Sequence, residues 1–275
     1  MNMPTLTDAR LTLEGRVALL TFDRHDVRNA LTGTTLVDDI VTTVTWANRT
    51  PEVSVLVMTG AGSAFSAGGN IKEMAERDDA HRDGAFGGNV LEVQQKYREG
   101  IQRMPLAMES AEIPIIAAVN GAAIGAGFDL SCMCDIRIGC ENTLLGETFI
   151  NLGIIPGDGG AWFLQRLIGY QRAAELTLSG RLVKADEARE LGILLEVVEA
   201  EQLLPRALEM AQSIAAKPPQ TLRMTKRLLK MAQRQPLGDF LDLCASFQGM
   251  CHNTEDHMEA VNAFLQKRPG QYQGR

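Results

Sequence analysis

The sequence of 275 residues lacks any long apolar run. None approaches the roughly 18–20 residues that a bilayer-spanning helix requires, so we expect no membrane partner. Residues 1–5 show neither the basic nor the apolar region of a secretory signal, so we predict a cytoplasmic protein. Positive charge is also scarce, since 27 Lys and Arg stand against 34 Asp and Glu, for a net charge of −7. A nucleic-acid partner is therefore not expected.

Cysteine and histidine are sparse, and neither forms a recognisable site. The five cysteines are an odd number in mostly apolar settings, which predicts reduced thiols: Cys132, Cys134, Cys140, Cys244 and Cys251. Cys132 and Cys134 are one residue apart and have no second pair, which argues against a zinc site. The four histidines follow no nucleophile or metal pattern. We therefore expect no metal.

Three common motifs are also missing. The sequence has no Gly-x-Ser-x-Gly elbow of a serine hydrolase and no Gly-Lys-Ser/Thr phosphate loop. The glycines of 121–127 do not follow the dinucleotide spacing Gly-x-Gly-x-x-Gly. What is present is the composition of an ordinary α/β protein, 45% hydrophobic and 22% charged with 26 glycines.

The chain is organised around residues 115–133. An apolar run at 115–119 predicts a buried strand, small residues follow, and from about Gly127 the pattern is helical. The first N–H groups of a helix are unpaired and carry partial positive charge, so this turn can hold an anion or an oxyanion beside Asp129. Tight packing alone is the alternative explanation of the small residues.

The same order of strand, small-residue turn and helix occurs at 53–74. Two such turns can each give one backbone N–H to the same oxygen, which is how an oxyanion hole is usually built. The alternative is two unrelated tight turns. The repetition of the unit favours the oxyanion hole.

Strands and helices alternate up to about residue 200, and helices alone are predicted beyond it. A hairpin is predicted at Glu14-Gly15, one helix over 89–111, and a mobile, charged and glycine-rich insertion over 77–88. The predicted C-terminal helices are 201–216, 219–232, 236–249 and 254–267. We therefore expect a core at 1–200 and a helical region at 201–275.

At residues 64–74, 117–130 and 152–160 the chain closely resembles the signature loops of the crotonase (enoyl-CoA hydratase/isomerase) superfamily. Further marks at 26–31, 179–193 and 264–269 extend the resemblance, in order, over nearly the whole chain. The resemblance implies an α/β fold, a spiral of repeated ββα units, with a C-terminal helical region that forms trimers or hexamers. It also implies an acyl-CoA substrate and no separate cofactor, because coenzyme A is part of the substrate.

The resemblance further implies a reaction through an enolate whose oxygen is held by the backbone N–H groups of Gly69 and Ala126. Ala126 stands where glycine is commoner, which is tolerable because the backbone acts. The residues implied to contact the coenzyme are Val27, Arg28 and Ala30, with Ala67, Asn70 and Ile71 near the adenine. Phe264 and Lys267 are implied to reach the nucleotide of a neighbouring subunit. For Lys267 the alternative is a solvated lysine at a helix end.

The sequence departs from the family at the two catalytic glutamates of its hydratases. The first falls on Asp129, which is one methylene shorter, and the second falls on Phe149, which cannot transfer protons and which we expect to shape the substrate pocket. Asp158 and Glu147 are the two acids that can substitute. Asp158 lies one residue past the usual position of a family aspartate, and its alternative role is to stabilise a turn and cap a helix. A structural role is the alternative for Glu147.

Asp129 is accordingly the predicted principal acid and base, three residues after Ala126, and Asp158 is a second catalytic candidate. One carboxylate can take a proton from one carbon and return it to another, so Phe149 favours double-bond isomerisation over hydration. Three alternatives stay open. They are a hydratase that pairs Asp129 with Asp158 or Glu147, an acyl-CoA hydrolase, and a non-catalytic acyl-CoA-binding subunit.

Overall fold

The computed structural model describes residues 2–75 and 86–275. Its strands are β1 (Ala9–Glu14), β2 (Val17–Phe22), β3 (Val55–Gly60), β4 (Ala64–Ser66), β5 (Ile115–Val119), β6 (Ala122–Ile124), β7 (Ile136–Cys140), β8 (Leu144–Gly146), β9 (Leu182–Lys184) and β10 (Glu196–Val198). Its α-helices are α1 (Leu36–Arg49), α2 (Ile71–Ala75), α3 (Val90–Glu99), α4 (Arg103–Ser110), α5 (Ala126–Met133), α6 (Gly160–Ile168), α7 (Tyr170–Ser179), α8 (Ala185–Glu190), α9 (Ala200–Ala215), α10 (Pro219–Met231), α11 (Leu237–His252) and α12 (Glu255–Leu265). Two short 3₁₀ helices are η1 (His25–Val27) and η3 (Thr148–Leu152). The insertion predicted over 77–88 lies, apart from its last three residues, outside the described residues.

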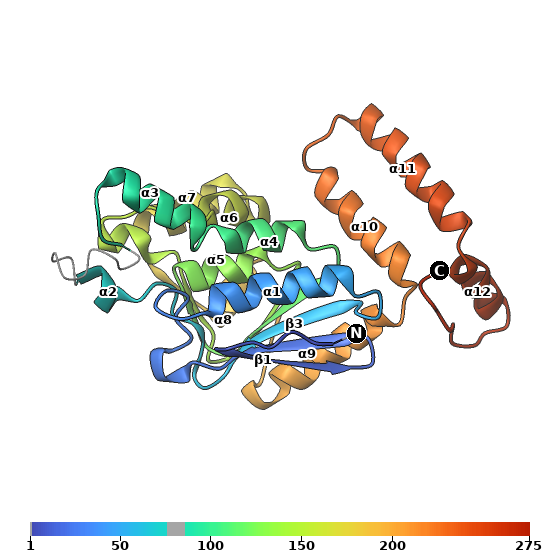
Figure 1. The fold of residues 1–275 in the computed structure, drawn as a ribbon, viewed down its shortest axis with the longest axis horizontal. Helices are drawn as coiled ribbons and strands as arrows, with labels where there is room; N and C mark the ends of the chain where they lie inside the picture. The colour runs from blue at the N-terminus through green and yellow to red at the C-terminus, as the bar shows by residue number, and fades with distance from the viewer. Residues whose placement is uncertain (1, 76–85) are drawn as a thin grey trace.

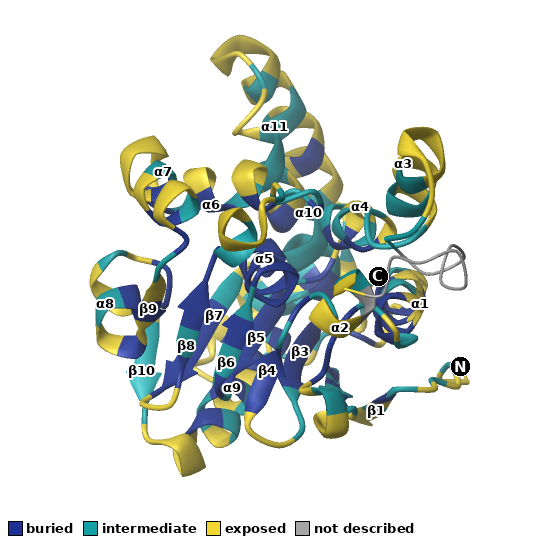
Figure 2. Cartoon of the chain, turned by 90° about the vertical axis from the view of Figure 1, so that its left-hand side faces the viewer, coloured by how far each residue is buried: buried dark blue, intermediate teal, exposed yellow. Residues whose placement is uncertain are grey.

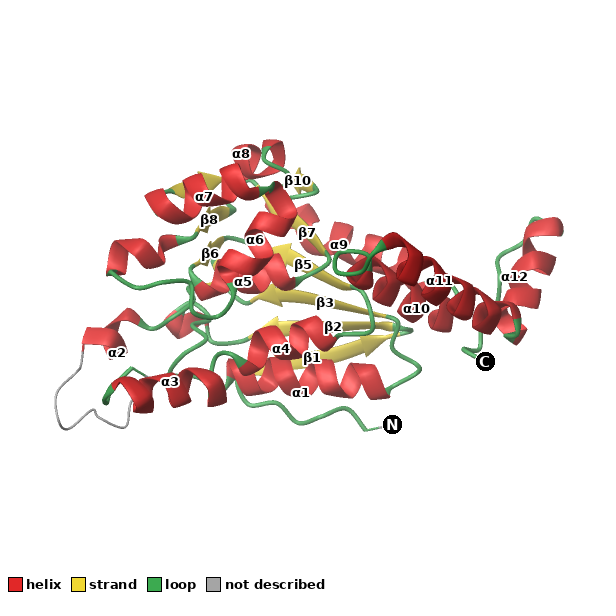
Figure 3. Cartoon of the chain, turned by 90° about the horizontal axis from the view of Figure 1, so that it is seen from above, coloured by secondary structure: helices red, strands yellow, loops and turns green. Residues whose placement is uncertain are grey.

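The strands form two sheets (Figures 1 and 3). The larger has the order β1-β2-β3-β5-β7-β10, in which β1 pairs antiparallel with β2 and the other neighbours are parallel. The smaller has the order β4-β6-β8-β9, with only β9 antiparallel among the described strands. The hairpin predicted at Glu14-Gly15 joins β1 to β2 and is confirmed.

Successive strands alternate between the two sheets, which produces a repeated unit. In the first unit, β3 lies in the larger sheet, β4 lies in the smaller sheet, and α2 follows. In the second unit, β5 and β6 lie in the same two sheets and α5 follows. β7 and β8 form a third pair of this kind. Equivalent strands of successive units are parallel neighbours, so the chain advances as a spiral of ββα units. This confirms the predicted fold.

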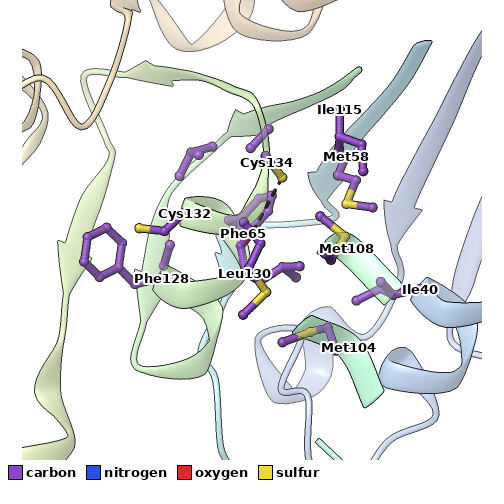
Figure 4. Close-up of a cluster of buried hydrophobic side chains, with 14 of the residues drawn as sticks. Ile40, Met58, Phe65, Met104, Met108, Ile115, Phe128, Leu130, Cys132 and Cys134 are labelled. Carbon is purple, nitrogen blue, oxygen red and sulfur yellow. Dashed lines mark hydrogen bonds between the residues drawn. The ribbon is translucent and has the colours of Figure 1, made fainter. Parts of the chain in front are cut away.

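The central strand β5 is buried on both faces, which explains its unbroken apolar sequence (Figure 2). Ile115 and Ala117 point into one apolar cluster, whereas Ile116 and Ala118 point into another, as the two-residue period of a strand requires. The first cluster packs the sheets against α1, α4 and α5, and part of it is drawn in Figure 4. The second lies between the larger sheet and α9.

Helix α5 occupies the centre of the first cluster, and all eight of its residues are buried. A helix that is apolar on every side must be enclosed by protein. Phe128 and Leu130 fill the core around it, whereas Asp129 is its one charged residue. The fold therefore places a carboxyl group in an environment that does not favour charge.

The C-terminal helices differ in how they meet the rest of the molecule. α9 packs directly on β3, β5 and β7 through Leu203, Ala207 and Ala211, whereas α10 to α12 stand away from the sheets (Figure 1). The division expected between 1–200 and 201–275 stays a prediction, and α9 lies with the sheets in packing. None of the described helices is long and apolar enough to cross a membrane.

Several short elements differ from the sequence-based expectation. The helix predicted over 89–111 is wrong in one respect, because the chain forms α3 and α4 with a break at Gly100, whose backbone leaves the helical region. The small-residue stretch after β5 contains the strand β6, and β4, β9 and β10 were also not predicted as strands. Each of these has three residues, which is too short to show a period.

Candidate active site

The two small-residue loops meet because the strands that precede them are neighbours. β4 and β6 are parallel, with Ala64 opposite Ala122, so the loops that follow them emerge at the same edge of the smaller sheet. Gly68 has φ +76°, and a Cβ there would lie 2.3 Å from the carbonyl oxygen of Ile124 and 3.0 Å from the amide nitrogen of Ala126. Only glycine permits this approach.

Gly69 and Ala126 both line one cavity. Their neighbours are engaged: Leu31 donates to the Gly68 carbonyl at 2.7 Å, and the Asn70 amide donates to Thr32 Oγ1 at 2.7 Å. Among the described residues, the amides of Gly69 and Ala126 themselves have no acceptor. Ala126 is also the first residue of α5, where the helix dipole is positive. Both residues thus line one cavity with amides that have no acceptor in the described chain, and their action on an oxyanion stays a prediction.

The cavity has a volume of about 250 Å³ and mostly apolar walls. Phe149, in η3, forms part of the wall, and its ring would lie 3.5 Å from a Cβ built on Gly125, next to the Ala126 amide. Asp38 and Arg103 also line the cavity and form an ion pair at 2.5 Å. Phe149 therefore places an aromatic ring in the cavity wall, close to Gly125.

Three buried carboxyl groups meet behind this cavity. Asp129 on α5 is 0% exposed, Glu147 after β8 is 1% exposed, and Asp158 before α6 is 3% exposed. Asp129 is in the middle, within hydrogen-bonding reach of both Glu147 and Asp158. Asp158 is part of the cavity wall, whereas Asp129 and Glu147 lie deeper. The structure thus brings together all three acids that the sequence offered.

Within residues 2–75 and 86–275 no ion pair involves this cluster, and no side-chain N–H or hydroxyl group donates to any of its six oxygens. Burial raises the pKa of Asp129 well above its ordinary value, and repulsion from Asp158 and then Glu147 raises it further. Burial also raises the pKa of Glu147 to about 7 and raises the pKa of Asp158. The raised pKa values bring the titration of these carboxyls closer to neutral pH than that of ordinary acids, so the cluster can both accept and donate protons.

The structure bears on the alternative roles of Asp158 and Glu147. Asp158 does not cap α6 in the described chain, because Gly159 occupies the N-cap position and no side chain bonds to the first turn. Glu147 is turned inward to the cluster. Glu147 has no special spacing in the sequence, and the one available signal was an acid between an apolar strand and Phe149 with no basic neighbour. Although three acids meet, no described group of His, Cys, Asp or Glu has the arrangement of a metal site.

The residues implied to hold coenzyme A fall into two groups. Ala67 and Ile71 line the cavity. The Ala67 amide donates to the Arg28 carbonyl at 2.9 Å. This hydrogen bond joins the loop that contains Val27 and Ala30 to the loop that contains Asn70. The Asn29 side chain strengthens this junction by donating to the carbonyls of Ala61 and Ala64. Their contact with a coenzyme stays a prediction.

Phe264 and Lys267 are in the second group. Phe264, on α12, is 84% exposed, and Lys267 follows the helix. Figure 1 shows α12 at the end of the molecule opposite α2, which adjoins the cavity, so these residues do not reach the cavity of their own chain. A contact from a neighbouring subunit remains the prediction for both.

The spiral of ββα units, with two amide groups from successive units facing one cavity, defines an enzyme of the crotonase type. The sequence pattern of the enoyl-CoA hydratase/isomerase family matches residues 12–275, and the chain belongs to this family.

Individual relatives agree with this assignment. The chain is 33% identical over 268 residues to the short-chain-enoyl-CoA hydratase of Clostridium acetobutylicum, covering 96% of each chain. It is 32% identical over 270 residues to the 2,3-dehydroadipyl-CoA hydratase of Escherichia coli, covering 98% of this chain and 100% of the relative. Among solved structures, an enoyl-CoA hydratase from Bacillus anthracis matches with a TM-score of 0.89 at 32% identity, over 98% of this chain and 100% of that one.

Proposed function

We propose that the protein isomerises a double bond in an enoyl-CoA thioester by moving a proton between two carbons of an enolate. Coenzyme A enters as part of the substrate, and this reaction requires no separate cofactor. The family assignment and the names of the relatives support an acyl-CoA substrate. The finer choice of isomerisation rests on the acids and the aromatic ring at the cavity.

The observation that carries the proposal is the arrangement of acids at the wall. Asp158 is the acid in the wall that has no cationic partner among the described residues, since Asp38 pairs with Arg103. Phe149 lines the same cavity, and the sequence resemblance matches it to the second glutamate of the family's hydratases. A hydratase needs one group for the water and another for the α-proton, whereas an isomerase can use the same carboxyl twice.

In the proposed reaction a C–H bond next to the thioester carbonyl breaks, and its proton passes to Asp158. Both carboxyl oxygens of Asp158 are buried, so this step requires its side chain to rotate and bring one oxygen to the cavity surface. The electron pair moves into the enolate, whose oxygen accepts hydrogen bonds from Gly69 and Ala126. The Asp158 O–H bond then breaks and the proton moves to the γ-carbon. In the reverse reaction the γ-proton is removed and the α-carbon is protonated. Asp129, behind Asp158, shares the proton while it is on the enzyme.

Hydration is the second candidate, and the names of the relatives favour it. In this case Asp129 and Asp158 together would replace the two glutamates. The aromatic ring of Phe149 opposes it, because an apolar ring beside the amides leaves no polar partner for the reacting water.

The products from 3-enoyl-CoA and 2-enoyl-CoA decide between the two. The proposal predicts that wild-type enzyme interconverts the two enoyl isomers and forms little 3-hydroxyacyl-CoA. Phe149→Glu should raise the proportion of 3-hydroxyacyl product, and Phe149→Leu serves as a matched apolar control. If wild-type enzyme forms mainly 3-hydroxyacyl-CoA, the hydratase alternative is correct.

Assembly belongs to the same proposal. The outer faces of α11 and α12 expose apolar side chains: Leu241, Met250, Met258, Val261, Phe264 and Leu265. Such a surface favours association of subunits, and a homotrimer or a hexamer is proposed. All five cysteines are free thiols, which supports the proposed cytoplasmic location. Light scattering of the purified protein measures the assembly.

A further inference from the structure

Glu147 is the member of the carboxyl cluster that the proposed reaction does not use. It follows β8 directly, is 1% exposed, and its next two residues, Thr148 and Phe149, line the cavity while Glu147 lies behind it. It cannot touch a substrate in the cavity from this position. Any effect of Glu147 on the reaction must therefore pass through another residue.

Asp129 connects Glu147 to the cavity. Asp129 is within hydrogen-bonding reach of Glu147 on one side and of Asp158 on the other. Glu147 and Asp158 act on each other through charge alone. Asp129 therefore links Glu147 to Asp158, and Asp158 is the member that lines the cavity.

The surroundings of Glu147 contain few other ionisable groups. The thiol of Cys132 on α5 faces it, but burial raises the pKa of this thiol to about 12, so it stays protonated. Arg137, on β7, donates to the carbonyls of Ile193 and Cys134. Within the described part of the chain, no ion pair involves any of the three carboxyls, so their charges are moderated only by protons that they share.

We infer that Glu147 is a positioning residue that takes up the Asp129 proton whenever Asp158 receives one from the substrate. This inference rests on the proposed proton transfer. When the substrate C–H bond breaks, Asp158 gains a proton and donates a hydrogen bond to Asp129. The Asp129 O–H bond breaks and its proton moves to Glu147. Return of the proton to the substrate reverses both movements, so the cluster ends with the number of protons with which it began.

The role follows from the cost of isolated charge in the interior. Without an acceptor behind it, Asp129 would keep its proton, and Asp158 would have to hold a second proton beside it. Asp158 would then be a weaker base. The free-energy cost of keeping Asp158 charged in the interior would then no longer favour transfer of the substrate proton to it.

The test compares Glu147→Gln with wild-type enzyme and with Glu141→Gln, the same change at an exposed glutamate before β8. The variant should lower kcat about tenfold or more. Binding of a saturated acyl-CoA should stay unchanged. The acid limb of the pH profile of kcat/KM should move about one pH unit lower, because one negative charge has left the cluster. Glu141→Gln should match wild type throughout, and Glu147→Asp should keep the wild-type limb.

Each other result overturns this inference. A structural role would lower the yield of folded enzyme and leave the pH limb in place. If Glu147→Gln does not fold, Glu147→Leu removes the buried acid without a polar group and should show the same shift. Failure of both to fold would make Glu147 a residue of the fold. A wild-type enzyme that exchanges no proton with the substrate would instead contradict the proposed function, which keeps the two failures distinct.

Discussion

The Asp129 carboxyl occupies the space where a side chain on Gly160 would stand. A Cβ built on Gly160 would lie 2.2 Å from Oδ1 and 2.3 Å from Oδ2 of Asp129. Gly160 begins α6, so the carboxyl also rests against the positive end of a helix. The absence of a side chain at Gly160 thus leaves space for the Asp129 carboxyl, and the turn before it contains Asp158.

Gly160→Ala should displace Asp129 and lower kcat by about 10²-fold or more, since an acid and base must stay within hydrogen-bonding reach of its partner. Gly238→Ala on α11 is the matched control, because nothing lies within 4 Å of its added Cβ. The control should keep its activity and gain about 0.5–1 kcal/mol in the free energy of unfolding. Steady-state kinetics and urea unfolding of both variants measure this, and an active Gly160→Ala enzyme would contradict the placement of Asp129.

Asp129→Asn should abolish turnover, with a loss of about 10²–10⁴-fold, because the amide cannot pass a proton to Asp158. Binding of a saturated acyl-CoA should persist, because Asp129 lies behind the cavity wall. Calorimetric titration and a turnover assay give the two quantities. Full activity in this variant would remove Asp129 from the mechanism.

Gly68→Ala should disturb the two amide donors. Its Cβ would meet the Ile124 carbonyl at 2.3 Å, so the loops must separate, and we expect kcat to fall about 10²–10³-fold. Gly15→Ala provides the control, since Gly15 also has positive φ but nothing within 4 Å. The control should lose about 1–2 kcal/mol of stability and no activity. Equal activity of the two variants would show that the close approach at Gly68 is unimportant.

The carboxyl cluster should make stability depend on pH. Because the pKa of Glu147 rises from 4.5 to about 7, the folded state keeps a proton that the unfolded state releases. The stabilising contribution is complete below about pH 4.5 and is lost as the pH rises through about 7. Each unit of upward shift corresponds to about 1.4 kcal/mol.

Glu147→Gln should therefore have a flatter dependence of unfolding free energy on pH between about 4.5 and 7 than wild type. Urea unfolding at several pH values measures it, with Glu141→Gln as the control. Parallel curves for Glu147→Gln and wild type would mean that Glu147 keeps an ordinary pKa in the folded protein.

The sequence predicted the features that repeat or that extend over many residues. The unbroken apolar run of β5 was sufficient to predict the buried strand. The two small-residue loops indicated a shared oxyanion hole, and the resemblance to the family named Gly69 and Ala126 as its donors. The C-terminal helices were predicted because their apolar patterns are long and prolines separate them.

The sequence offered Asp158 or Glu147 as the partner of Asp129, but the meeting of all three acids could not be predicted, because they come from three different segments. Glu147 follows a strand of three residues and Asp158 lies in a turn, so neither has a period that indicates its direction. Only the folded chain shows that both point to Asp129. The break between α3 and α4 escaped prediction because Gly100 interrupts a pattern that is otherwise helical.

Mass spectrometry of 3-enoyl-CoA and 2-enoyl-CoA incubated with the enzyme in D₂O tests the central claim most directly. We predict a shifted double bond, deuterium at the carbons next to the thioester or in the γ position, and no addition of water. Asp129→Asn should show neither exchange nor shift. Addition of water without isomerisation would contradict the account and assign hydration, and recovery of both substrates unchanged would contradict proton transfer by this cluster altogether.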